Sequence, residues 1–370
     1  MRRFALLAVP LMLAACTSKT EGIAVLGDGS HGLEEMTVEV LATSADGLDA
    51  PSDVSLNPLD LSQLWVTNYN DNSITILSGD DYANIDTPTS GGANHFLVAP
   101  MALAFSDFGN FATIHDTDDL TQGNATPADF MGPVLWDDSA DYDGGHGGHL
   151  DMLHNSPLGG GIAWEEDNTY WVFDGYNASL TRYAFNGDHG YGGADHSDGQ
   201  IVRYAEGEVS RIEGIPSHMQ LDHESGLLYV ADTANARVAV LDIATGERGG
   251  RIGPNYDGLD EMYEMDGATI FTLADGGALV SALNDRGREL TDVSEVEMVQ
   301  PSGLHLQGDT VFVSDHDTSR IFAFNLEGEL LDWVQLDMEP GHLGGMTLDA
   351  DGNIVVVDMV ANELIRISAQ

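Results

Sequence analysis

Hydrophobic and polar residues alternate over short stretches of this chain, and the stretches return several times in the same order. The clearest copies span residues 216–242 and 301–325, each with a small-residue lead-in, an apolar run, a polar turn and a second apolar run that ends in Asp. Within the first copy, Leu228 and Val230 alternate with Tyr229. A period of two is typical of β-strands, so we expect an all-β chain.

Further copies begin at Pro51, Pro100, Gly159 and Leu343, and a weak one begins at Thr269. The mean step is about 49 residues, and repetition at that period with a few short strands per unit predicts a β-propeller with one blade per unit. The weak copy leaves the number of blades at six or seven.

The two ends of the chain complement each other. The last unit offers three candidate strands, within residues 345–348, 354–358 and 364–368, and therefore lacks a fourth. Residues 36–43 alternate in the same way but have no partner of their own. We expect this N-terminal strand to pair with the last blade and close the ring, which removes two exposed sheet edges.

A polar residue follows an apolar strand in six of the units, at Asn68, Asp116, Asp174, Asp232, Asp315 and Asp358. Although these residues resemble a ring of carboxylates, we expect them to accept hydrogen bonds from backbone N–H groups of the turns. The segment Asp349–Asn353 lacks a downstream acidic ligand, which favours a plain Asx-Gly turn over a calcium loop.

The N-terminus has the pattern of an export signal. Arg2 and Arg3 precede an apolar stretch, residues 4–13, that is too short to span a membrane. The Leu-Ala-Ala-Cys run that ends at Cys16 resembles the lipobox of bacterial lipoproteins. That resemblance implies cleavage before Cys16 and lipid attachment to its sulfur. Because Thr17 rather than Asp follows, it also implies an outer-membrane lipoprotein.

We therefore divide the chain into a signal peptide (1–15), a lipidated cysteine with a flexible tether (16–35) and a propeller (36–370). Two insertions of different composition, at about 118–157 and 186–215, interrupt the propeller. The chain has a single cysteine, which excludes an internal disulfide and a thiolate metal site.

The net charge of the chain limits the classes of molecule that it can bind. The chain has 13 basic and 61 acidic residues, a formal net charge of −48. Such an anionic surface repels nucleic acid and anionic lipid headgroups. The expected partners are therefore the membrane, reached through the N-terminal lipid, and a protein or small molecule at the propeller face. The charge is explained by solubility in a salty exterior, by attraction of cations, or by both.

The insertions and one lead-in contain candidate metal ligands. These residues are His146, His149, His154, His189, His196, His218, Asp188 and Asp195. Asp151 lies among them in sequence. Imidazole and carboxylate groups bind divalent metals such as Zn, Cu or Ca, and glycine-rich backbone lets them converge. The alternative is a solvated acidic loop whose histidines bind nothing.

The repeat resembles the NHL-repeat propellers, most closely at Pro216, Gly226, Asp232, Asn235 and Arg237. This resemblance covers about residues 50–370. Among NHL-type propellers, the peptide-amidating lyases hold zinc with one lead-in histidine from each of three blades. Here only His218 comes close to such a position.

Two functions follow as expectations. The first is a lipid-anchored binding or scaffold protein of the cell envelope, with or without a divalent metal in the insertions. The alternative is a metal-dependent lyase or hydrolase with a histidine site at the channel mouth. No nucleophile elbow, phosphate-binding loop or catalytic cysteine is present in the sequence.

Overall fold

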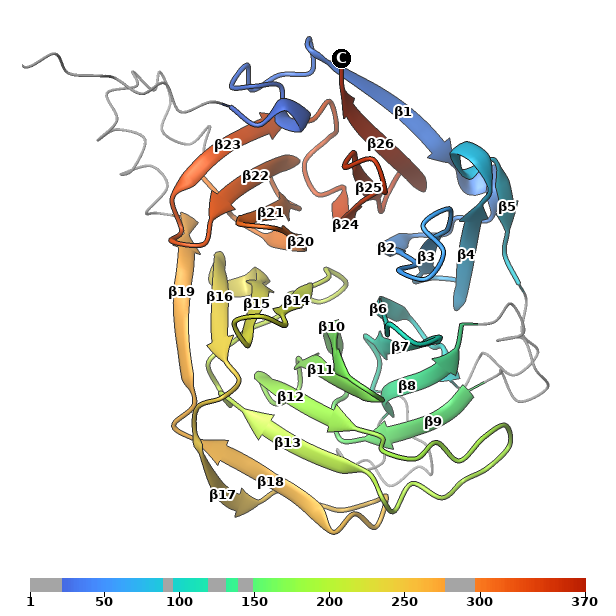
Figure 1. Ribbon diagram of the computed structural model, residues 1–370, viewed down its shortest axis with the longest axis vertical. Coiled ribbons are helices and arrows are strands. Elements are labelled where there is room, and N and C mark those ends of the chain that lie inside the picture. Colours follow the sequence, from blue (N-terminus) through green and yellow to red (C-terminus); the bar gives the residue numbers. More distant parts are fainter. Residues whose placement is uncertain (1–21, 89–95, 119–130, 139–148, 277–296) are drawn as a thin grey trace, which may run out of the picture.

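The computed structural model describes residues 22–88, 96–118, 131–138, 149–276 and 297–370. Its strands form six separate sheets arranged as blades around a central axis, so the protein is a six-bladed β-propeller (Figure 1). Within each blade the innermost strand lies next to the axis, and the chain moves outward through the next two strands in sequence order. Apolar side chains of neighbouring blades pack face to face and form the core between them.

Blade 1 consists of β2 (Pro51–Leu56), β3 (Leu64–Asn68), β4 (Ser73–Ser78) and β5 (Asn84–Asp86). Blade 2 consists of β6 (Pro100–Phe105), β7 (Asn110–His115), β8 (Met131–Asp137) and β9 (His149–His154). Blade 3 contains β10 (Gly159–Glu166), β11 (Thr169–Asp174), β12 (Ser179–Ala184) and β13 (Gln200–Tyr204). Blade 4 consists of β14 (Met219–Asp222), β15 (Leu227–Asp232), β16 (Arg237–Asp242) and β19 (Thr269–Asp275). Blade 5 consists of β20 (Pro301–Gln307), β21 (Thr310–Asp315), β22 (Arg320–Asn325) and β23 (Leu330–Gln335). Blade 6 consists of β24 (Leu343–Leu348), β25 (Ile354–Asp358), β26 (Glu363–Ala369) and β1 (Met36–Ala42). Short 3-10 turns lie at η1 (Ala24–Leu26), η2 (Ser44–Asp46), η3 (Asp80–Tyr82) and η5 (Thr233–Asn235).

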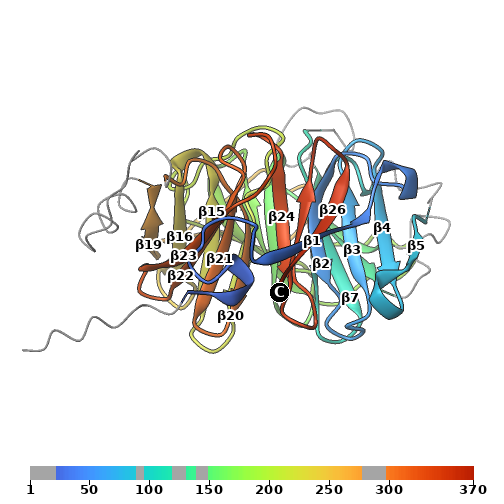
Figure 2. The same cartoon turned by 90° about the horizontal axis from the view of Figure 1, so that it is seen from above.

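Ring closure by the N-terminal strand is confirmed. β1 pairs antiparallel with β26, from Met36 opposite Ala369 to Val40 opposite Ile365. It is the outermost strand of blade 6, so the first and last strands of the chain lie side by side (Figure 2). The last blade is therefore held together by both ends of the sequence.

The weak seventh unit at Thr269 is not a blade. It forms β19, the outermost strand of blade 4, which pairs with β16 so that Phe271 lies opposite Val240. Its side chains are mostly exposed, so its alternation of polar and apolar residues reflects an outer strand with one solvated face. Of the two predicted blade numbers, six and seven, six is correct.

The two expected insertions also contain blade strands. Residues 118–157 include β8 and β9, the outer half of blade 2, and residues 186–215 include β13 of blade 3. β9 was hidden in the sequence because three of its six buried residues are His149, Asp151 and His154. Polar side chains at buried positions erase the apolar alternation on which strand prediction depends.

A real excursion occurs where none was predicted. Between β16 and β19 the chain forms a hairpin, β17 (Glu247–Arg251) and β18 (Glu261–Asp266). β18 adds in parallel to the outer edge of β13, which extends blade 3 to six strands. The hairpin thus links blade 4 to the outside of blade 3.

Residues 22–35, expected to belong to a flexible tether, pack on the propeller instead. Leu26 is fully buried against blades 5 and 6. The Asp332 carboxylate accepts hydrogen bonds from the backbone N–H groups of Ile23 and Gly29, and the His31 ring stacks on Trp333. The signal peptide, Cys16 and the rest of the tether lie outside the described residues.

Three of the six Asx residues, Asp174, Asp315 and Asp358, accept a hydrogen bond from a backbone N–H of the following turn as predicted, whereas the other three accept one from another segment. Asp315 accepts hydrogen bonds from the backbone of Thr318 in the following turn and of Val299 and Gln300 in the lead-in. Asp349 likewise accepts two backbone N–H groups of its own turn. These carboxylates therefore stabilise blade corners. Among the described residues, no helix is long and apolar enough to cross a membrane.

Candidate functional site

One residue of each blade occupies an equivalent position, at the start of the inner strand or in its lead-in. These equivalent positions, third in each lead-in, are Asp53, Ala102, Gly161, His218, Gly303 and Gly345. Four of them have a methyl group or no side chain, and the other two are an acid on blade 1 and a base on blade 4. In a ring of six, blades 1 and 4 face each other across the axis.

Asp53 and His218 meet there. His218 Nε2 lies 3.3 Å from Asp53 Oδ1, and both side chains are buried. The other carboxylate oxygen of Asp53 accepts a hydrogen bond from the backbone N–H of Leu103, at 2.9 Å. A Cβ atom on Gly345 would lie 2.4 Å from the His218 ring and 2.7 Å from Asp53 Cα, so glycine is required for the pair to form.

Burial dominates the electrostatics of this pair. It raises the pKa of Asp53, although the charge of His218 opposes the shift. Burial also lowers the pKa of His218, against the effect of the Asp53 charge. Both shifts favour the uncharged form of each group, because an ion in a dry site loses its hydration. At neutral pH His218 is therefore a neutral imidazole.

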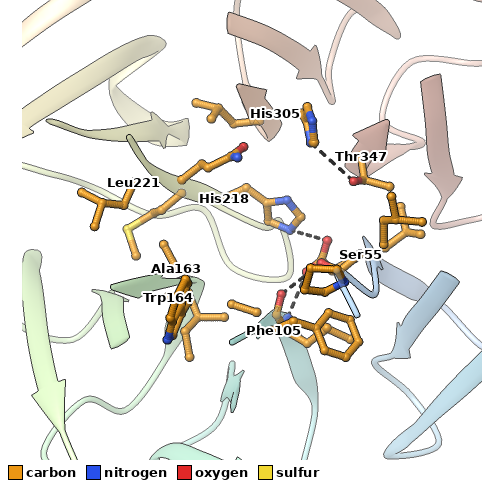
Figure 3. Close-up of a pocket in the computed structure, with 18 of the residues that line it drawn as sticks. Ser55, Phe105, Ala163, Trp164, His218, Leu221, His305 and Thr347 are labelled. Carbon is orange, nitrogen blue, oxygen red and sulfur yellow. Dashed lines mark hydrogen bonds and ion pairs between the residues drawn. The ribbon is translucent and has the colours of Figure 1, made fainter. Parts of the chain in front are cut away.

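A cavity of about 290 Å³ lies at this pair and is called the channel pocket below. The inner strands of all six blades contribute to its wall (Figure 3). Its polar groups include Asp53, Ser55, Gln220, His218, His223, His305 and Thr347, and its apolar groups include Leu103, Phe105, Trp164, Met219, Leu304 and Met346. The site thus combines aromatic and thioether surface with a few hydrogen-bonding groups, as ligand pockets do.

His305 is another of the three histidines that line the channel pocket. Its Nδ1 lies 3.4 Å from the hydroxyl oxygen of Thr347 on the neighbouring blade. Burial lowers the pKa of His305 to about 4. The pocket wall therefore contains two imidazoles that are uncharged at neutral pH and can each donate and accept a hydrogen bond.

Two of the predicted metal ligands converge elsewhere, on the outside of the ring. His189 and His196, on the loop between β12 and β13, meet Asp151 of β9, and one ligand atom from each lies within 4.8 Å of the others. His196 Nδ1 is 2.7 Å from Asp151 Oδ1. We call these three residues the edge cluster.

The other insertion histidines have different surroundings. The ring of His149 stacks on Phe96 with centroids 3.7 Å apart and meets the edge of the His189 ring. His154 Nδ1 lies 2.6 Å from Asp257, a buried carboxylate of the β17–β18 hairpin. His146 lies outside the described residues.

The two predicted acidic ligands lie in exposed turns. Asp188 accepts a hydrogen bond from the backbone N–H of Gly190, and Asp195 accepts two from Ser197. Hydrogen bonds to Ser197 lower the pKa of the Asp195 carboxyl. Neither residue belongs to the edge cluster, and His218 lies in the channel rather than with the insertion histidines.

The sequence prediction missed Asp53, His305 and Asp257. Asp53 could have been found, because it occupies the same lead-in position as His218 once the units are aligned. His305 and Asp257 carry no such signal. Their partners come from other blades or from the unpredicted hairpin.

No protein-family model matches the chain, and no curated protein matches it in sequence. Solved structures do share its fold. An auxiliary nutrient binding protein from Bacteroides thetaiotaomicron superposes with a TM-score of 0.57 at 8% identity, over 90% of this chain and 76% of that one. One from Bacteroides ovatus gives 0.53 at 10% identity, over 91% and 77%.

Virginiamycin B lyase from Staphylococcus aureus superposes with a TM-score of 0.50 at 11% identity, over 91% of this chain and 100% of that one. At such identities these likenesses concern the propeller architecture alone.

Proposed function

We propose that the protein is an exported, lipid-anchored propeller that binds a small molecule in the channel pocket. The observation that carries the proposal is the construction of this pocket, to which the inner strands of all six blades contribute. A site made by rigid strands is preorganised, so a ligand that enters loses little binding free energy to ordering the protein. The Leu-Ala-Ala-Cys run at Cys16 supports the lipid anchor.

The chemistry of the wall indicates the class of ligand. Trp164 and Phe105 offer aromatic surface, while neutral His218 and His305 offer hydrogen bonds. The acidic chain, with Asp107 at the same pocket, repels anions. We therefore propose an uncharged or cationic organic molecule of about the size of a sugar or an amino acid, matched to a cavity of this volume. The nutrient-binding propellers that share the fold fit such a role, although their ligands say nothing about this one.

The geometry favours binding over the metal-dependent enzyme. An enzyme of that kind needs an ion with an open coordination position beside the bound substrate. Among the described residues, the group able to hold an ion is the edge cluster, on the outer strand β9 and an outer loop, whereas the pocket is lined by inner strands. The pocket and the cluster are therefore separate sites.

The proposal is tested by screening sugars, amino acids and small amines for a rise in the melting temperature of the purified chain. Any compound that binds is then measured by calorimetry with wild-type protein and with Ser55→Trp, which places an indole in the pocket. Filling the cavity should weaken binding by at least about tenfold. Trp333→Ala, on the outer strand of blade 5, is the matched control and should bind normally.

If no compound of these classes binds, or if Ser55→Trp binds as tightly as wild type, the channel pocket is not the site we propose.

A further inference from the structure

We propose that the edge cluster, Asp151 with His189 and His196, binds one divalent transition-metal ion of the zinc type. This site goes beyond the proposed function, because it lies on the outside of blades 2 and 3 rather than in the channel (Figure 1). Neither site shares a residue with the other.

The loop that carries both histidines is fixed to the neighbouring blade. The backbone N–H of His189 donates to the carbonyl of Leu150 on β9, at 3.1 Å. The loop then turns back on itself at Gly193, where a Cβ atom would lie 2.4 Å from the carbonyl oxygen of His189. Only glycine permits this turn, which brings His196 back beside His189 with ring centroids 5.1 Å apart. The three side chains are therefore positioned by backbone contacts before any ion binds.

His189 has the arrangement of a metal ligand. Its Nδ1 lies 2.7 Å from the carbonyl oxygen of Gly190. Because a carbonyl only accepts, Nδ1 carries the proton and Nε2 presents its lone pair. The His189 side chain is 3% exposed, and its Nε2 atom lies 3.9 Å from Asp151 Oδ1. Among the residues that the structure describes, this buried atom has no hydrogen-bond partner. A hydrogen bond from the second ring nitrogen to a backbone carbonyl is the usual way in which proteins orient a metal-binding histidine.

The other two residues complete the donor set. The Asp151 side chain is 1% exposed, and its carboxylate lies against both histidines. Because this carboxylate is buried, its negative charge is costly in this position unless a cation shares it. In this geometry Nδ1 of His196 donates a hydrogen bond to the Asp151 carboxylate at 2.7 Å, and a bound ion would take the place of that proton while also engaging Nε2 of His189.

The distances are within reach of coordination. Ligand atoms around a tetrahedral zinc ion, each about 2.1 Å from the metal, lie about 3.4 Å apart. In the edge cluster the three ligand atoms lie within 4.8 Å of one another. Side-chain rotations that move these atoms by about 1 Å would therefore bring them to coordination distance. Two nitrogens and one oxygen suit zinc and its neighbours, whereas calcium prefers oxygen ligands alone. Three protein ligands leave a position for water or another ligand.

The test uses the full chain, stripped of metal with a chelator and titrated with Zn²⁺ in a calorimeter. We expect one ion per chain, and we expect His189→Ala to weaken the binding by at least about tenfold, as loss of even an indirect ligand contact does. Because the His189 ring is buried, His196→Gln provides a second variant at a more exposed ligand. Co²⁺ absorption bands in wild type, lost in both variants, would report direct coordination.

Two matched controls separate the site from its surroundings. Asp195→Asn removes a carboxylate from the same loop, and His154→Ala removes a neighbouring buried histidine that pairs with Asp257. Both should retain one tightly bound ion. The proposal is overturned if wild type binds no Zn²⁺, if the ligand variants bind it as tightly as wild type, or if the controls lose it equally.

Discussion

His305 makes the stability of the propeller depend on pH in a direction that can be worked out. A histidine in an unfolded chain has a pKa of about 6.5, whereas burial in the pocket wall lowers the pKa of His305 to about 4. Between these two values the unfolded chain binds a proton that the folded chain does not, so acid favours unfolding. The contribution is absent above about pH 6.5 and grows as the pH falls toward 4.

The magnitude follows from the size of the shift. From about pH 6.5 to pH 5 the unfolded histidine is protonated over 1.5 pH units at about 1.4 kcal/mol per unit, which gives about 2 kcal/mol. Because the ring borders the pocket, we take this as the largest expected value. His305→Gln removes the titrating group while keeping a polar side chain. Its free energy of unfolding should therefore fall by about 2 kcal/mol less than that of wild type between about pH 7 and pH 5.

The assay is urea unfolding followed by circular dichroism at both pH values, for wild type and variant. Comparing the two proteins cancels the other groups whose pKa is shifted by burial, such as His218, His316 and Asp174. Thr347→Val, which removes the neighbouring hydroxyl but keeps His305, should retain the wild-type pH dependence. A difference between wild type and His305→Gln below about 0.5 kcal/mol would refute the reasoning, as would an NMR titration of this ring near pH 6.5.

Two further substitutions test how the ring is held together. Asp332→Ala removes the carboxylate that accepts hydrogen bonds from the backbone N–H groups of Ile23 and Gly29. Hydrogen exchange measured by mass spectrometry should therefore be at least about tenfold faster at these two amides. Unchanged exchange rates would show that apolar packing alone holds this segment on the propeller. Asp232→Ala removes the buried carboxylate that pairs with the Arg237 guanidinium. The free energy of unfolding, measured by urea denaturation, should fall by about 3 kcal/mol. A loss below about 1 kcal/mol would show that this Asx residue contributes little to stability.

The sequence was sufficient for the architecture because propeller blades repeat. The lead-ins, the apolar strands and the Asx corners return in each unit, so even the pairing of residues 36–43 with the last blade could be inferred from a missing strand. What failed was the treatment of strands without the repeat pattern. β9 buries three polar side chains and β19 exposes one face, and each was assigned to the wrong kind of element.

The sites were harder to predict, for a physical reason. His218 stood out as a lone histidine, but its partner Asp53 comes from the opposite blade, 165 residues away in sequence (218 − 53). In the insertions, spacing alone could not separate His189 and His196, which meet Asp151, from His154, which pairs with Asp257. Convergence depends on the path of each loop, and that path depends on glycines and backbone contacts between blades.

The pairing of β1 with β26 also sets an order of events during synthesis. The outer strand of blade 6, β1, precedes every other strand in the sequence, while its partner β26 and the other two strands of that blade follow all the rest. Blades 1, 2 and 5 each consist of strands that follow one another directly in sequence, so each can assemble without waiting for a distant part of the chain. The N-terminal strand must wait, unpaired, until β26 has been synthesised, because contacts so distant in sequence form late. Throughout that interval the chain carries an open edge, and the ring becomes a single cooperative structure only when its two ends meet.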